Sequence, residues 1–80
     1  MRTRKLALAF GSVLREVRLQ KGISQDTLAS LCDFDRTYPS LLERGLRSPT
    51  LAMIFRISEA LEINPSVLVA KTYDVLRQPY

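Results

Sequence analysis

GISQDTLASLCDFDRTYPSLLERGLRSP, residues 22–49, contains two short helical patterns separated by a brief turn. The first helix is predicted over about 25–32, because Ser24 is a favoured cap and apolar residues follow at helical spacing. The second is predicted over about 36–44, with Asp35 as its cap and a glycine directly after it. We expect the remaining chain to support these two helices.

Apolar residues at helical spacing predict one helix before this stretch and two after it. The first is expected over about 6–20, and the fourth over about 51–61 with Thr50 as its cap. The pair Asn64–Pro65 is a cap followed by proline at the first helical position, which predicts a fifth helix over about 65–77. The residues of the fourth helix that we expect to face the core are Leu51, Ile54, Ile57 and Leu61.

Length and composition predict one folded domain. The chain has 80 residues, of which 46% are hydrophobic and 25% charged, as is usual for a small folded protein. No strand pattern accompanies the five helices. The predicted fold class is therefore all-α, a single domain over 1–80 with its core over about 6–68.

Missing residue types exclude several classes of function. The sequence has no histidine and one cysteine, Cys32, so neither a zinc site nor histidine-dependent catalysis is available. No glycine-rich phosphate loop is present. We expect no enzyme activity, no metal and no cofactor. A lone thiol fits a reducing cytoplasm. No segment approaches the roughly 20 apolar residues of a membrane span.

Positive charge is concentrated in the first part of the chain. The formal net charge is +4, and all of it falls within residues 1–50, while residues 51–80 are neutral. This distribution favours an anionic partner for the first part and apolar self-association for the second.

The second central helix begins Asp-Arg-Thr-Tyr, which suits a helix-turn-helix that enters the major groove of DNA by its N-terminal end. Arg36 can donate two hydrogen bonds to guanine O6 and N7, and Thr37 can donate or accept. Gln25, at the start of the preceding helix, can donate to a phosphate. Each residue also has a plainer interpretation: Arg36 as a solvated charge, Gln25 as an exposed side chain, and Tyr38 as a ring packed on the protein.

A larger pattern links these positions across about 10–68. Its residues are Arg18, Ser24, Gln25, Leu28, Ala29, Asp35, Arg36, Thr37, Tyr38, Ser40, Glu43, Arg44, Gly45, Arg47, Pro49, Thr50 and Leu51. The pattern is similar to that of the lambda-repressor-like (Xre) family of DNA-binding domains, especially the controller proteins of restriction-modification systems. The resemblance implies a five-helix domain whose helix-turn-helix is formed by the second and third helices.

The resemblance also implies a role for each matching residue. It assigns base reading to Arg36, Thr37, Tyr38 and Ser40. It assigns phosphate binding to Ser24, Gln25, Arg44, Arg47 and Ser48. Arg18 and Glu43 are implied to form a structural ion pair between the first and third helices.

Two positions depart from the family pattern. Asp33 stands where a glycine is usual, at a turn that needs left-handed backbone, which Asp tolerates. Pro39 stands where an aliphatic core residue is usual, and its missing N–H removes a hydrogen bond from the first turn of the third helix. We therefore predict an altered first turn that shifts Arg36 and Thr37.

The fifth helix carries a second apolar stripe. Val69, Tyr73 and Leu76 recur at helical spacing, in addition to Leu68, which we expect in the core. A neutral helix with a spare apolar face favours dimerisation. The alternative is a helix folded back on its own domain.

These observations predict a homodimeric transcription regulator that binds double-stranded DNA at a roughly palindromic operator, with the helix over about 36–44 in the major groove. Repression and activation are both compatible with the sequence. The alternative is a protein-interaction module, antitoxin-like or adaptor, with the same fold and little DNA affinity. RNA binding is disfavoured because stacking aromatics are missing. The basic residues Arg2, Arg4 and Lys5 form either a solubilising tail or an arm along DNA.

Overall fold

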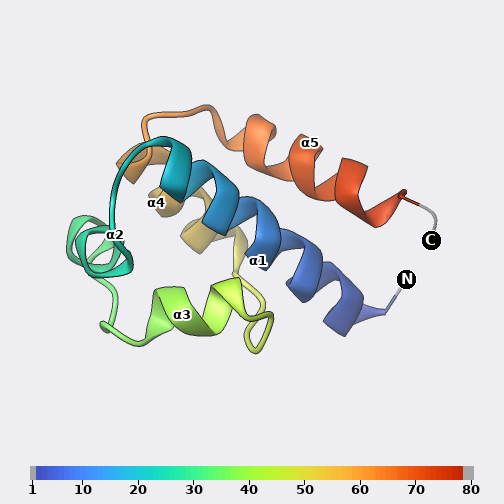
Figure 1. Ribbon diagram of the computed structural model, residues 1–80, viewed down its shortest axis with the longest axis horizontal. Coiled ribbons are helices and arrows are strands. Elements are labelled where there is room, and N and C mark those ends of the chain that lie inside the picture. Colours follow the sequence, from blue (N-terminus) through green and yellow to red (C-terminus); the bar gives the residue numbers. More distant parts are fainter. Residues whose placement is uncertain (1, 79–80) are drawn as a thin grey trace.

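The computed structural model describes residues 2–78, which form five α-helices and no strand. The helices are α1 (Thr3–Gln20), α2 (Gln25–Cys32), α3 (Tyr38–Glu43), α4 (Leu51–Ala60) and α5 (Pro65–Leu76). α1 lies in the middle, with α5 along one side and α3 along the other (Figure 1). The all-α prediction is confirmed. Residues 1, 79 and 80 of the predicted domain lie outside the described residues.

One apolar core lies where the helices meet. Each of the five helices contributes at least one fully buried side chain to it. The fully buried residues are Leu14, Leu28, Pro39, Leu42, Ile57, Leu61 and Leu68. Burying an aliphatic side chain of this size stabilises a fold by roughly 1.5–3 kcal/mol. The core therefore fixes α2 and α3 on α1 as one unit.

Side-chain caps define the starts of three helices. Ser24 Oγ accepts from the backbone N–H of Thr27 at 3.0 Å, and Thr50 Oγ1 accepts from that of Met53 at 3.1 Å. Asn64 Oδ1 accepts from the N–H of Ser66 at 2.9 Å. The caps predicted at these three residues are confirmed.

Two predicted features at helix starts are wrong. α1 begins at Thr3, earlier than the predicted position 6, because its first turn precedes the apolar stripe from which the start was predicted. Leu51, which was expected to face the core, is 68% exposed. The stripe of α4 meets the core only from Ile54 onward, so the leucine of the first turn stays at the surface.

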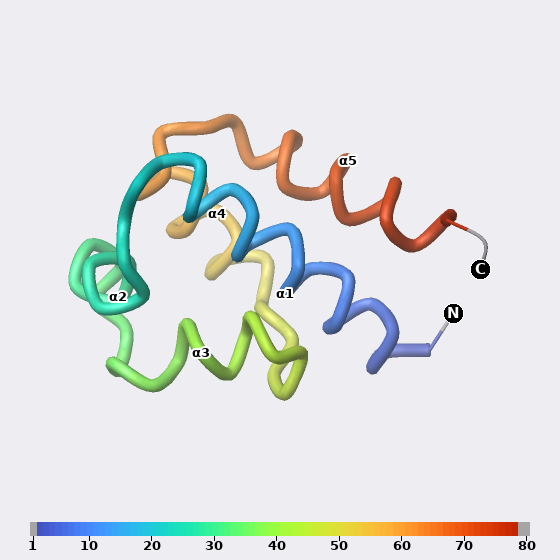
Figure 2. Tube along the Cα trace, viewed as in Figure 1, coloured from blue at the N-terminus to red at the C-terminus, as the bar shows by residue number. Residues whose placement is uncertain are grey.

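The segment between α2 and α3 begins at Asp33, the first of the two departures from the family pattern. Asp33 has φ 57° and adopts the left-handed conformation expected there. The trace then turns, and α3 lies across the view whereas α2 is seen nearly along its axis (Figure 2). The two helices are therefore not parallel, as a helix-turn-helix requires.

The third helix begins later than predicted. Its range is Tyr38–Glu43 rather than about 36–44, so Arg36 and Thr37 lie in a turn before it. The N–H of Tyr38 donates to the carbonyl oxygen of Asp35 at 3.0 Å, the spacing of a tighter 3₁₀ turn. Pro39 has no N–H with which to extend the α-helix backward. The expected alteration of the first turn is present.

α1 and α3 approach each other closely at Gly11. A Cβ placed on Gly11 would lie 2.7 Å from the carbonyl oxygen of Glu43, and it would also meet the carbonyl oxygen of Leu42. Any other residue would collide with the backbone of α3. A glycine in the middle of a helix lowers stability by roughly 0.5–1 kcal/mol relative to alanine. The close packing of α3 explains why a glycine stands at this position despite that loss.

Candidate nucleic-acid interface

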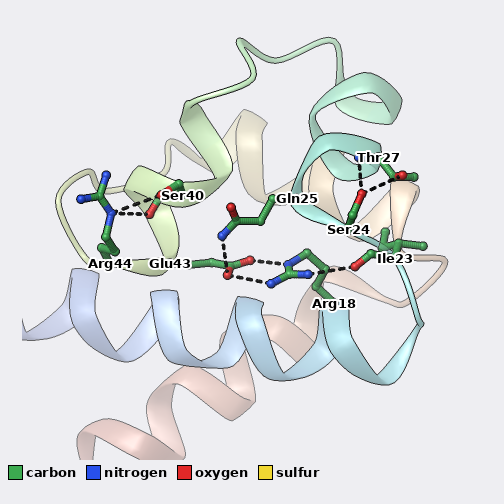
Figure 3. Close-up of polar contacts among 8 residues, drawn as sticks. All are labelled: Arg18, Ile23, Ser24, Gln25, Thr27, Ser40, Glu43 and Arg44. Carbon is green, nitrogen blue, oxygen red and sulfur yellow. Dashed lines mark hydrogen bonds and ion pairs between the residues drawn. The ribbon is translucent and has the colours of Figure 1, made fainter.

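A buried carboxylate connects α1, α2 and α3 (Figure 3). Arg18 Nε donates to Glu43 Oε2 at 2.6 Å and Arg18 Nη2 donates to Glu43 Oε1 at 3.0 Å, so the pair is bidentate. The side chains are 7% and 3% exposed, respectively. Arg18 Nη1 donates to the carbonyl oxygen of Ile23 at 2.9 Å. The ion pair implied by the resemblance is present, and its hydrogen bonds raise the pKa of Arg18.

Gln25 shares the same carboxylate. Its Nε2 donates to Glu43 Oε1 at 3.0 Å, and the side chain is half-buried rather than freely exposed. An amide nitrogen carries two N–H groups, so one faces Glu43 and the other remains for a further acceptor. The direction of the Gln25 amide is therefore set by Glu43, which Arg18 holds in turn.

The turn before α3 carries three exposed polar residues. Asp35 Oδ1 accepts from the backbone N–H of Thr37 at 2.9 Å and from Thr37 Oγ1 at 2.6 Å. These hydrogen bonds lower the pKa of Asp35. Asp35 was expected to cap α3 itself, but Thr37 is the residue before the helix and Asp35 stabilises the preceding turn.

Arg36 forms an ion pair that the sequence did not predict. Its Nη2 lies 3.1 Å from Asp26 Oδ2 in the first turn of α2, and the two side chains are 82% and 66% exposed. A pair this exposed contributes about 0–1 kcal/mol, so it orients Arg36 without immobilising it. The two residues are ten positions apart across a turn, a separation for which no helical spacing rule predicts contact.

Tyr38 packs on the protein, as its plainer interpretation proposed. Its ring lies 5.0 Å from that of Phe34 at an interplanar angle of 83°, an edge-to-face pair. Burial raises the pKa of Tyr38, and the positive charge of Arg47 offsets part of this effect. Ser40 Oγ accepts from Arg44 Nε at 3.2 Å.

The remaining phosphate-binding candidates differ in availability. Arg44 and Arg47 are exposed. Ser24 is exposed too, but its hydroxyl donates to Thr27 Oγ1 at 3.0 Å within the cap of α2. Ser48 is exposed and lines a groove formed with α1, α4 and α5, so its surroundings differ from those of the other candidates.

That groove is apolar and contains the three residues of the predicted dimerisation stripe. Val69 and Tyr73 are 51% and 58% exposed, and Leu76 is half-buried. The groove has a volume of about 680 Å³ and is also lined by Phe10 and Ile54. The opposite face of α5 packs on α1, so the helix folds back on its domain and still exposes the stripe.

Within residues 2–78, no helix has the length and apolar character needed to cross a membrane. Over the same residues, no three side chains of the metal-binding types gather at one place.

Known proteins are similar to this chain in sequence and in fold. Residues 14–68 match the helix-turn-helix family. Control protein C.BamHI of Bacillus amyloliquefaciens is 44% identical over 68 residues, which are 84% of this chain and 84% of that protein. The restriction-modification controller protein C.AhdI from Aeromonas hydrophila superposes with a TM-score of 0.81 and 41% identity, covering 85% of this chain and 99% of that one. The controller protein C.Esp1396I, solved as a tetramer in complex with its natural 35 base-pair operator, has a TM-score of 0.81 and 30% identity, covering 91% and 96%.

Proposed function

Because the chain belongs to the helix-turn-helix family, we propose that it is a transcription regulator that binds a roughly palindromic DNA operator as a homodimer. One observation carries this proposal: Arg36 and Thr37 are exposed in the turn ahead of α3, and Glu43 anchors α3 to α1. The major groove of B-DNA is about 12 Å wide and admits a helix with the residues at its start directed toward base edges.

The proposed base readers are Arg36, Thr37, Tyr38 and Ser40. Arg36 is the strongest of them, because its planar guanidinium matches the O6 and N7 acceptors of guanine. Its exposed contact with Asp26 is weak enough to be exchanged for a base. Tyr38 is half-buried against Phe34, so the unburied part of the ring is the part proposed to meet DNA.

The proposed phosphate contacts surround these readers. They are Ser24, whose hydroxyl hydrogen must leave Thr27 Oγ1 to reach a phosphate, Gln25, Arg44, Arg47 and Ser48. The free N–H of Gln25 is the best oriented of these donors, because Glu43 fixes its amide. The exposed guanidinium groups supply charge and the salt dependence that follows from counterion release.

The proposed dimer interface is the stripe of Val69, Tyr73 and Leu76. One helix-turn-helix reads only a few base pairs, whereas a two-fold pair reads half-sites about 34 Å apart. Exposed apolar residues around a groove support self-association.

A regulator of this kind acts where its DNA lies, so the proposed location is the cytoplasm. Because the chain has no histidine, we also propose that it has no catalytic activity.

The experiment that tests this proposal is selection of bound sequences from a random DNA pool. We expect a recurring half-site, repeated with two-fold symmetry at a spacing near one helical turn. Binding to random duplex should also weaken steeply with salt. A pool without enrichment, together with weak binding that salt does not change, would support the protein-interaction module instead.

Arg36→Ala is expected to weaken binding to the selected operator by about 1–3 kcal/mol and to relax the preference at one base position. Affinity for operators substituted at each position, measured by fluorescence anisotropy, checks this. The matched control is Arg56→Ala, which removes another exposed arginine outside the proposed interface. Equal losses of Arg36→Ala on operator and on random duplex would count against base reading.

Arg47→Ala is expected to weaken binding to all duplexes alike, because a phosphate contact carries no sequence information. The slope of log affinity against log salt should decrease in magnitude by about 1. The check is a salt titration on both operator and random duplex. An unchanged slope with altered base preference would instead make Arg47 a base reader.

Tyr73→Asp is expected to make the protein monomeric, because a carboxylate would then lie in an apolar interface without a partner. Sedimentation velocity measures the change. Ala70→Asp places the same charge at an exposed position of α5 outside the stripe and should leave the dimer intact. Unchanged sedimentation of Tyr73→Asp would exclude this stripe as the interface.

A further inference from the structure

The hydroxyl group of Thr37 has its hydrogen committed within the protein. A threonine hydroxyl has one hydrogen to donate and two lone pairs that accept. Thr37 Oγ1 lies 2.6 Å from Asp35 Oδ1, the length of a charge-assisted hydrogen bond to a carboxylate. An ionised carboxylate only accepts, so the hydrogen in this bond belongs to Thr37.

Asp35 is well placed to keep that hydrogen. The same oxygen, Oδ1, also accepts from the backbone N–H of Thr37 at 2.9 Å, so two bonds fix the carboxylate beside the hydroxyl. Both bonds lower the pKa of Asp35, which keeps the carboxylate ionised near neutral pH. Thr37 is exposed, and its oxygen therefore presents lone pairs, but no hydrogen, to a ligand.

We infer that Asp35 makes Thr37 an obligate hydrogen-bond acceptor, so that Thr37 recognises an exocyclic amino group of a base, adenine N6 or cytosine N4. This inference rests on the proposed function, in which Thr37 meets base edges. In the major groove only these two amino groups donate, whereas guanine O6 and N7, adenine N7 and thymine O4 accept. Phosphate oxygens also only accept. The inference therefore excludes a hydrogen bond from Thr37 to a phosphate, as well as one to these base acceptors.

Neighbouring residues then read opposite hydrogen-bond polarities. Arg36 carries only donors, and an aspartate, Asp26, contacts it at 3.1 Å. Thr37 carries only acceptors toward the ligand, because another aspartate, Asp35, takes its hydrogen. Asp35 thus acts as a positioning residue that determines which base Thr37 selects.

The test uses the operator selected by the wild-type protein and variants that remove one amino group. In both half-sites, each adenine in turn is replaced by purine, which lacks the N6 amino group, and each cytosine by 2-pyrimidinone, which lacks the N4 amino group. Thr37→Val removes the hydroxyl and keeps the shape of the side chain. We expect Thr37→Val to weaken binding to the unmodified operator roughly 3- to 10-fold per half-site. On the duplex that lacks the contacted amino group, this loss should disappear.

Two further variants sharpen the result. Thr37→Ser keeps the hydroxyl and should respond to removal of amino groups as the wild-type protein does. Asp35→Ala frees the hydroxyl hydrogen, so a second selection with this variant should admit bases with acceptors at the same position. Circular dichroism of each variant verifies that the helices remain folded.

Different outcomes separate the inference from the proposed function. The inference is overturned if Thr37→Val binds the operator as tightly as the wild-type protein does, or if its loss of affinity persists on every duplex lacking an amino group. It is also overturned if 7-deazaguanine or a methylphosphonate in the duplex abolishes that loss of affinity. In each of these cases the wild-type protein still prefers its operator to random duplex, so the proposed function stands. If the wild-type protein shows no such preference, both are wrong.

Discussion

Arg18→Ala is expected to lower the free energy of unfolding by about 3–5 kcal/mol, one of the two largest effects predicted for this protein. The substitution leaves the Glu43 carboxylate, 3% exposed, without the bidentate cation that now compensates its burial. Removing one partner of a buried ion pair is costly mainly because the other charge remains out of water. Urea denaturation at neutral pH, monitored by circular dichroism, measures the loss.

A matched control for Arg18→Ala is Lys71→Ala, which breaks an exposed ion pair with Glu16. Those two charges lie 3.7 Å apart, with side chains 43% and 58% exposed, and their interaction should be worth about 0–1 kcal/mol. A loss for Arg18→Ala no larger than that of the control would show that the Glu43 carboxylate is solvated after all.

Replacing both members of the buried pair separates its structural and functional roles. An Arg18→Met, Glu43→Met double variant contains no buried charge and should regain most of the stability lost by Arg18→Ala. It should not regain DNA affinity, because the amide of Gln25 has lost the carboxylate that orients it. Restored DNA affinity in this variant would show that Glu43 is not needed to position Gln25.

Gly11→Ala is expected to destabilise the protein by up to about 3 kcal/mol, the other large effect. The added methyl group meets backbone atoms of α3, among them the carbonyl oxygen of Glu43 at 2.7 Å, and backbone cannot rotate away as a side chain can. Helix propensity alone predicts the opposite sign, a gain of about 1 kcal/mol for alanine over glycine inside a helix. The sign of the measured change in thermal or urea denaturation therefore decides the question.

The neighbouring substitution Ser12→Ala serves as the control for Gly11→Ala. Ser12 is exposed on α1, so its replacement should change stability by no more than about 0.5 kcal/mol. If Gly11→Ala proves stabilising, α1 and α3 do not approach each other as closely as described. If it destabilises, DNA affinity should fall with it, since α3 must shift on α1.

Much of the fold follows from local signals in the sequence. Side chains that cap a helix act on backbone N–H groups three residues away or fewer, so Ser24, Thr50 and Asn64 could be identified without the structure. Pro39 likewise acts on its own turn. The delayed start of α3 follows from the missing N–H of Pro39, which is a property of that residue alone.

The features that the sequence did not reveal are contacts between distant segments. The position of Leu51 depends on where the stripe of α4 first meets the core, which its own spacing does not specify. The hydrogen bond from Gln25 to Glu43 and the pairing of Arg36 with Asp26 join different helices. Gly11 is itself a sign of such a contact, because a glycine inside a helical pattern calls for a packing reason.

The late start of α3 has a consequence for how such proteins diverge. Arg36 and Thr37 lie outside the helix and are exposed, and substitutions at such positions usually change stability by no more than about 0.5 kcal/mol. Exchange of these two proposed base readers in duplicated genes would therefore change the target site while the folded scaffold is inherited unchanged. Arg18, Glu43 and Gly11 have no such freedom, so drift in this lineage should be slow there and fast in the turn.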